Sequence, residues 1–362
     1  MLLSTLAVYV PLAFKDFSIV ARHYDGPFYM YIAKTFYVIP PDHPFHQHLP
    51  ASFYAGQFPM YPILIRLLTL FTLGNYPAAM VLATLSSSIG AVLLFYKLLQ
   101  SWELVRSPIW TSVLFCFFPE RWLMQHVIGS TEPLFFCLIF GAFISYKQKR
   151  DLLVFLCITL ACLTRPPGFL MVPIFGFFYL RHRRWKTAFL IPFTLSGLLL
   201  LFLYHQYVFG DFLAAFRMHT TMAFASSSTQ RSSINSYPLA IYRFYAERPS
   251  FHSTELFLLL YVLSLIGTLA LWKKKEFFFY SLVYLLFTFF VFSFDLPRYL
   301  LPIAPFAYLV AFDEILSHRA FRFIVFPLFL YLAYTFVLGF LPLATCSPET
   351  FRDMLHQIRT LP

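Results

Sequence analysis

Long apolar stretches, separated by short basic clusters, constrain the fold of this chain more than any other feature. Apolar residues make up 59% of the 362 residues and charged residues only 12%, against about 25% charged residues in a typical soluble domain. A water-soluble fold of this length has too little interior to hide so much apolar surface. The sequence therefore predicts an all-α protein, a polytopic transmembrane helix bundle with about eleven spans, among them 77–98, 133–146 and 299–316.

The basic clusters predict the orientation of the bundle. The apolar length between successive clusters can cross a bilayer an even number of times, so all of them can face the cytoplasm, as the positive-inside rule requires. The clusters are 147–150, 181–184, 273–275, and His318 and Arg319 with Arg322. This topology accounts for much of the net charge of +11, so we do not expect nucleic-acid binding.

We expect a single transmembrane domain over 1–362, because no internal repeat or linker divides the chain. The long first extracytoplasmic loop, 15–58, follows a first span at 1–14, and a second external segment covers 208–253. Apolar residues at helical spacing in 28–35 and 61–68 predict two helices that lie flat in the membrane interface. The chain would end in a short external tail after a last span at 323–341.

A second set of charged residues falls on the face opposite the basic clusters. Charges at membrane depth cost free energy and usually have a function. The set comprises Asp25, Glu120, Arg121, Glu132, Arg165, Asp295 and Arg298. We therefore look for the chemistry of the protein among these side chains.

Asp25 lies in the segment Arg22-His23-Tyr24-Asp25-Gly26-Pro27, just beyond the first predicted span. A carboxylate in a partly desolvated pocket at the membrane surface can act as a general base. Gly26 and Pro27 would form the turn that presents it, with a helix beginning at Pro27. The alternative is that Asp25 only caps this helix.

Two arginines, Arg165 and Arg298, lie at predicted external span ends, each beside a proline. An arginine offers a permanently charged fork of donors that suits phosphate, so two converging arginines would fit a lipid phosphate. Alternatively, each side chain extends to the headgroups without a specific partner.

Glu120 and Glu132 admit two interpretations. They form a structural ion pair with Arg121, or they line a polar pocket that orients a substrate hydroxyl. His43, His46 and His48 could ligate a transition metal, but their spacing matches no specific site, so we expect neither a metal nor another cofactor.

Three short motifs give these residues a family context. They are Phe58-Pro59-Met60-Tyr61-Pro62, Ser130-Thr131-Glu132-Pro133-Leu134-Phe135 and Thr164-Arg165-Pro166. Together with the early Asp25 they resemble the GT-C glycosyltransferases, in particular the transferase that adds the second mannose of the GPI anchor and its bacterial counterparts. The resemblance covers roughly 15–170, and beyond that only the topology and the Pro297-Arg298-Tyr299 corner.

The resemblance implies a membrane glycosyltransferase. Such an enzyme moves a sugar, with mannose as one candidate, from a polyprenyl- or dolichyl-phosphate carrier to a glycan, lipid or protein acceptor on the extracytoplasmic face, with inversion. It implies Asp25 as the general base. Arg165, Arg298 and Arg121 would bind the carrier phosphate. Arg22, Glu120, Glu132 and Tyr61 would support the substrate site.

A polytopic transporter or flippase is the alternative function. Transporters place polar residues near the bilayer midplane and often contain repeated halves, whereas here the ionisable residues gather at one predicted face and no repeat is visible. The chain has no tail that resembles a retention signal, which favours a bacterial inner membrane over the endoplasmic reticulum. The identities of the sugar and the acceptor stay open.

Overall fold

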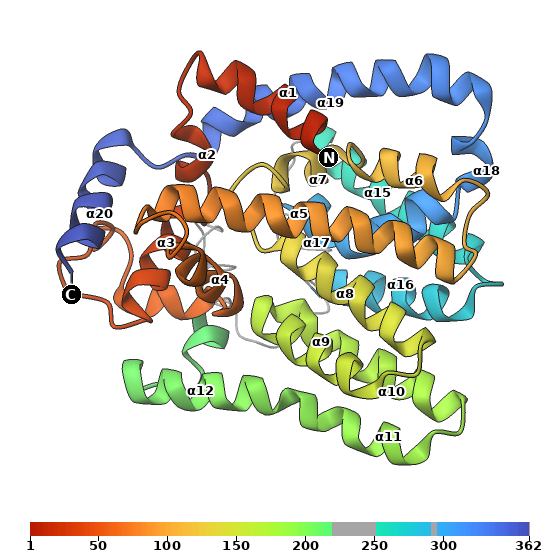
Figure 1. Ribbon diagram of the computed structural model, residues 1–362, viewed down its shortest axis with the longest axis horizontal. Coiled ribbons are helices and arrows are strands. Elements are labelled where there is room, and N and C mark those ends of the chain that lie inside the picture. Colours follow the sequence, from red (N-terminus) through yellow and green to blue (C-terminus); the bar gives the residue numbers. More distant parts are fainter. Residues whose placement is uncertain (219–250, 291–294, 362) are drawn as a thin grey trace.

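The computed structural model describes residues 1–218, 251–290 and 295–361 (Figure 1). Over these ranges the protein is helical and forms no β-strand, and an isolated β-bridge joins His23 to Thr345. The α-helices are α1 (Leu2–Ala13), α2 (Ile19–Arg22), α3 (Gly26–Thr35), α4 (Met60–Leu68), α5 (Tyr76–Ser101), α6 (Pro108–Phe115), α7 (Glu120–Gln125), α8 (Glu132–Lys147), α9 (Asp151–Thr164), α10 (Met171–Arg181), α11 (Trp185–Leu190), α12 (Ser196–Phe209), α15 (Phe251–Ala270), α16 (Lys275–Thr288), α17 (Leu296–Leu300), α18 (Asp313–Leu316), α19 (Phe326–Phe340) and α20 (Pro348–Thr360). The all-α part of the prediction is confirmed.

Three helical segments are long and apolar enough to cross a membrane: Tyr76–Ser101, Trp185–Phe209 and Phe321–Ala344. Large apolar side chains on their outer faces are exposed, among them Leu200 and Phe323, and lipid contact explains such exposure. The protein is therefore membrane-associated.

The expected eleven spans are not all present as helices of spanning length. A span needs about 20 residues, or about 30 Å of helix, whereas α1 has only 12 residues. The predicted span at 299–316 is not one helix. It is divided into the end of α17, a 3-10 helix (Leu301–Ile303), a π-helix (Pro305–Val310) and α18. Prolines at 302 and 305 remove backbone donors there. The full span count stays a prediction.

The main core lies where α5, α8 and α9 pack side by side, with α10 and α16 against them (Figure 1). Phenylalanine rings fill it, including Phe95, Phe115 and Phe140, whose centroids are 4.7 to 5.7 Å apart. Such ring pairs stabilise a core beyond their buried area. This core holds α8 and α9 as a rigid support for the residues at their ends.

The turns that carry the basic residues meet at one end of this bundle, on the right in Figure 1. Lys147 Nζ lies 4.9 Å from the Trp102 ring centroid, and Lys274 Nζ donates to the Leu104 carbonyl at 2.6 Å. Glu132 begins α8 and Lys147 ends it, so a helical rise of about 23 Å separates the two. The acidic and basic residues near Glu132 therefore lie at the opposite end of α8 from the basic clusters; that the two ends face opposite sides of a membrane stays a prediction.

A second, smaller core lies under the predicted first loop. The apolar stretches at 28–35 and 61–68 form α3 and α4, as predicted, and their buried faces pack together. Their flat position in a membrane interface stays a prediction. The second external segment, 208–253, falls mostly outside the described residues.

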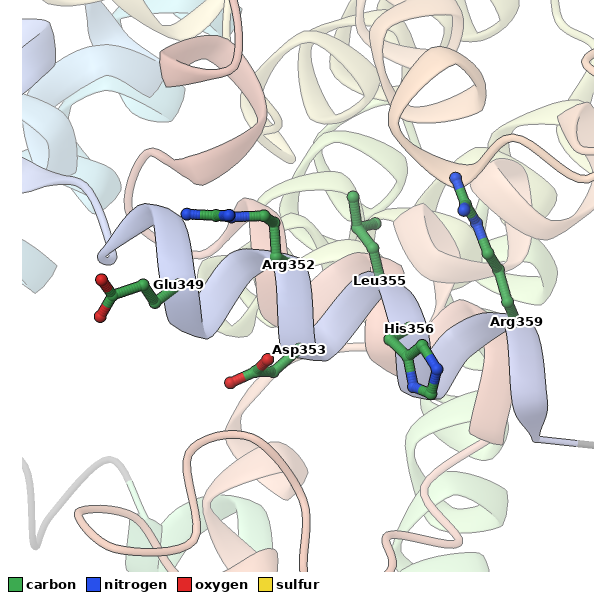
Figure 2. Close-up of a pocket in the computed structure, with 6 residues that line it drawn as sticks. All are labelled: Glu349, Arg352, Asp353, Leu355, His356 and Arg359. Carbon is green, nitrogen blue, oxygen red and sulfur yellow. The ribbon is translucent and has the colours of Figure 1, made fainter.

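The predicted short external tail contains the amphipathic helix α20, and its external position stays a prediction. The Ser347 side chain caps it by accepting from the Thr350 N–H at 3.1 Å, and Pro348 occupies its first turn. Its apolar face packs on α3, through Phe351, Met354 and Ile358. Its exposed side chains include Arg352 and Asp353, which lie on different sides of the helix (Figure 2).

Candidate functional site

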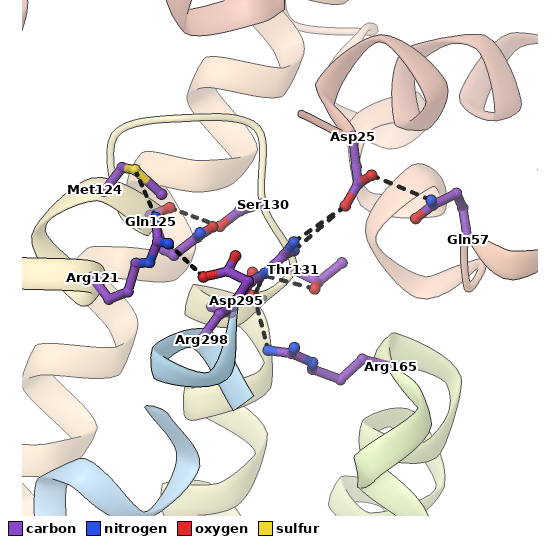
Figure 3. Close-up of polar contacts among 11 residues, drawn as sticks. Asp25, Gln57, Arg121, Met124, Gln125, Ser130, Thr131, Arg165, Asp295 and Arg298 are labelled. Atoms are coloured by element: carbon purple, nitrogen blue, oxygen red, sulfur yellow. Dashed lines mark hydrogen bonds and ion pairs between the residues drawn. The ribbon is translucent and has the colours of Figure 1, made fainter. Parts of the chain in front are cut away.

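Asp25 lies in the turn between α2 and α3, and its carboxylate does not cap α3. No side-chain cap hydrogen bond forms at this position among the described residues. Instead Gln57 Nε2 donates to Oδ1 at 3.4 Å, and Arg298 Nη1 lies 3.4 Å from Oδ2 (Figure 3). The Asp25 side chain is 26% exposed. The helix-cap alternative is wrong, and the carboxylate is both accessible and oriented.

Glu132 is the centre of the charged cluster. Its side chain is 1% exposed, and its Oε1 contacts Arg165 Nη1 at 3.0 Å and accepts a hydrogen bond from Arg298 Nε. Arg165 follows the last residue of α9, Glu132 begins α8 and Arg298 lies in α17. Helices distant in sequence thus bring Arg165 and Arg298 to a single carboxylate, and the predicted convergence of these two arginines is confirmed.

Arg121 pairs with Asp295, and neither Glu120 nor Glu132 is its partner in the described ranges. Arg121 Nη2 lies 2.6 Å from Asp295 Oδ1, and the guanidinium lies 4.8 Å from the Phe340 ring centroid. Burial raises the pKa of the Asp295 carboxyl, while the positive charge of Arg121 opposes that increase. The predicted pairing of Arg121 with either glutamate is therefore wrong, because α17 brings Asp295 to it.

The charges of this ion-pair network balance. It contains the carboxylates of Asp25, Glu132 and Asp295 and the guanidiniums of Arg121, Arg165 and Arg298. Buried charges of both signs satisfy one another, which avoids a large desolvation cost. A phosphate could still bind, because a guanidinium has five N–H donors. Within the described part of the chain, Arg165 Nη1 makes no hydrogen bond of good geometry despite its contact with Glu132.

Arg22 lies outside this network. Its Nη1 donates to the Cys346 carbonyl at 2.7 Å and its Nε to Ser18 Oγ at 2.9 Å, and it also pairs with Asp16. Its donors thus hold α2 against the segment that precedes α20. In this structure Arg22 positions the turn that bears Asp25, rather than facing the network.

Tyr61 and Glu120 also lie apart from Asp25. Tyr61 is fully buried, its hydroxyl lies 2.6 Å from Thr84 Oγ1, and its ring packs edge-on against Tyr29 at 5.1 Å. Glu120 begins α7, where burial raises the pKa of its carboxyl. Tyr61 therefore packs against α3 through Tyr29, and in the described ranges no side-chain hydrogen bond or ion pair links Glu120 to the network.

The C-terminal segment anchors the turn that bears Asp25, which the sequence did not indicate. The Tyr24 N–H donates to the Ala344 carbonyl at 2.9 Å, and His23 Nδ1 lies 2.8 Å from the Leu341 carbonyl. Tyr24 has a φ of 43°, an uncommon conformation for a non-glycine residue that needs such support. The helical spacing of Phe351, Met354 and Ile358 could have predicted α20, but it does not reveal where the helix docks.

His43, His46 and His48 do not converge on a metal site. His43 is buried beside Tyr54, with its Nδ1 3.4 Å from the Tyr54 hydroxyl, whereas His46 and His48 are exposed. In the ranges that the structure describes, no three His, Cys, Asp or Glu side chains are grouped to hold a metal ion.

The fold and the site define a helical, membrane-associated protein with a buried ion-pair network at one end of its central helices and a partly exposed aspartate beside it. Comparison with known proteins adds no relative: no family model matches the chain, and no curated protein matches it.

Proposed function

We propose that the protein is a multi-pass membrane glycosyltransferase. It transfers a sugar, with mannose as the first candidate, from a polyprenyl- or dolichyl-phosphate carrier to an acceptor on the extracytoplasmic face, with inversion. The observation that supports this most is the carboxylate of Asp25, which is partly exposed, makes no helix-cap hydrogen bond and lies 3.4 Å from Arg298. Arg298 and Arg165 in turn both contact Glu132.

In this proposal Asp25 accepts the proton of the acceptor hydroxyl. The hydroxyl oxygen attacks the anomeric carbon, the bond from that carbon to the phosphate oxygen breaks, and the carrier phosphate leaves with the electron pair. Gln57 donates to Oδ1 of Asp25 and Arg298 donates to Oδ2, so the carboxylate is held in place, and Oδ1 keeps a second lone pair that can take the proton. Arg298 and Arg165 stabilise the charge that develops on the leaving phosphate.

The position of the network suits a carrier that cannot leave the bilayer. The network lies at the start of α8, about 23 Å from the basic residues at the end of that helix. With about eleven spans and the basic clusters in the cytoplasm, Asp25 would face the opposite side of the membrane. A bacterial inner membrane is our preferred location.

Incubation of the purified protein with polyprenyl phosphates that carry different single sugars tests the function. We expect one of these donors to be consumed, with release of the carrier phosphate and formation of a glycoside of inverted configuration. Nucleotide sugars serve as control donors and should remain intact. If no lipid-linked donor is consumed, while proteoliposomes containing the protein move such lipids between leaflets, the flippase alternative replaces the proposal.

The donor affinity of Arg298 variants tests the phosphate site. Arg298→Ala should raise the apparent KM for the lipid donor about ten- to a hundred-fold, because it removes hydrogen bonds to a charged group. Arg298→Lys keeps the charge but loses the planar fork, so its KM should be intermediate. Arg352→Ala, at an exposed arginine of α20 outside the ion-pair network, is the matched control and should leave KM unchanged. An unaltered donor KM in Arg298→Ala would remove this residue from the phosphate site.

A further inference from the structure

An apolar groove of about 840 Å³ lies between α2, the first turns of α5 and α20. It extends along α5 from Asn75, the N-cap residue, to Leu85, a rise of about 15 Å. Val81 and Leu82 contribute the α5 wall, and Leu355 lies on the α20 wall. The volume is that of a typical small-molecule site, and the lining is suited to a hydrocarbon chain.

One charged side chain, Arg359 in the last turn of α20, is present among the described residues that line the groove. Arg359 is exposed and has no acidic partner on the groove wall. A single permanent cation beside an apolar groove matches an amphiphile that has an anionic head and an apolar tail.

The surroundings of the groove indicate that its mouth faces lipid. Leu73, which also lines the groove, is 96% exposed, and its neighbours Leu70 and Phe71 are exposed too. Phe14, which directly follows α1, is 87% exposed as well. Large exposed apolar side chains near a helix of spanning length belong in a bilayer. α20 instead carries the exposed charged side chains of Glu349, Arg352 and Asp353 (Figure 2), so the groove lies at the boundary between lipid and water.

We infer that this groove holds one acyl chain of a phospholipid, with the lipid phosphate beside Arg359. The site is distinct from the ion-pair network. Ala21 lines the groove, and its carbonyl oxygen lies directly under Gly26, where an added Cβ would come within 2.9 Å of it. The backbone of α2 therefore separates the bound chain from Asp25. This inference does not depend on glycosyl transfer.

Lipid counting by native mass spectrometry tests the site. The delipidated protein in detergent is titrated with dioleoylphosphatidylglycerol, and we expect one lipid to bind before any others. Arg359→Glu should weaken this first binding step about five-fold or more, since one cation near a lipid phosphate contributes about that factor in affinity. Arg352→Glu, about two turns earlier on the same helix and outside the lining of this groove, is the matched control and should bind as the unaltered protein does.

A variant that fills the groove tests the chain site separately. Val81→Trp should abolish the first binding step while the circular dichroism spectrum and elution profile stay unchanged. Equal weakening by both arginine variants, or full binding by Val81→Trp, would overturn the inference. Binding of dioleoylglycerol or inorganic phosphate as tightly as the phospholipid would also overturn it. Displacement of the phospholipid by polyprenyl phosphate would overturn it too, because the groove would then be a site for the carrier lipid.

Discussion

Asp25→Asn protein should insert in the membrane and fold normally, yet it should transfer sugar about 10²- to 10⁴-fold more slowly, because it lacks the general base. Asparagine has nearly the same shape and can still accept from Gln57, but it cannot take the proton of the acceptor hydroxyl. The long contact of 3.4 Å with Arg298 and the 26% exposure of the side chain mean that little stability is lost. The measurement is the initial rate of carrier-phosphate release with a saturating lipid donor.

Asp353→Asn is the matched control for this experiment, since Asp353 is exposed on the outward face of α20 (Figure 2). It should retain the full rate. Full activity in Asp25→Asn would show that another group accepts the proton. A variant that fails to accumulate in the membrane would instead show that Asp25 is needed for folding, and thermal unfolding of the purified protein distinguishes these outcomes.

The sequence predicted those parts of the fold that local hydrophobicity determines. The expected span at 77–98 corresponds to α5, Tyr76–Ser101, and the expected span at 133–146 corresponds to α8, Glu132–Lys147. In both, a proline in the first turn marks the start and polar residues mark the end. The prediction weakened at 299–316, because the hydropathy of an apolar run does not reveal where prolines divide it.

The sequence predicted which residues gather at the candidate site, but not which of them form ion pairs with one another. Arg165, Glu132 and Arg298 were all expected on one face, and they do meet. The choice of partners depends on how helices from distant parts of the chain pack, so the pairing of Arg121 with Asp295 has no local signal. Docking of α20 beside the Asp25 turn was missed for the same reason, although its cap and apolar spacing are visible in the sequence.

The balance of charges links the stability of the network to its proposed chemistry. Rigid helices hold Glu132 between two guanidiniums, so the donors for a phosphate are oriented before the substrate arrives. The arginines themselves need a compensating carboxylate while the site is empty, because unpaired buried charges are costly. Glu132 would then serve mainly to keep Arg165 and Arg298 in place.

Glu132→Ala should lower the free energy of unfolding by about 3–5 kcal/mol, the usual effect of breaking a buried ion pair. Its carboxylate is 1% exposed, and its removal leaves the largely buried Arg165 and Arg298 without their shared partner. Glu314→Ala is the matched control, since Glu314 is 79% exposed and pairs with Arg106 at 2.7 Å; the loss there should be at most about 1 kcal/mol. Denaturant unfolding of both variants in the same detergent gives the comparison.

A double variant, Glu132→Ala with Arg165→Met, should regain part of the lost stability, because it removes one of the uncompensated charges. Equal losses in Glu132→Ala and Glu314→Ala would mean that water or lipid headgroups already solvate these arginines. The network would then not be a buried, preorganised phosphate site, and the role proposed for Arg165 and Arg298 would lose its physical basis.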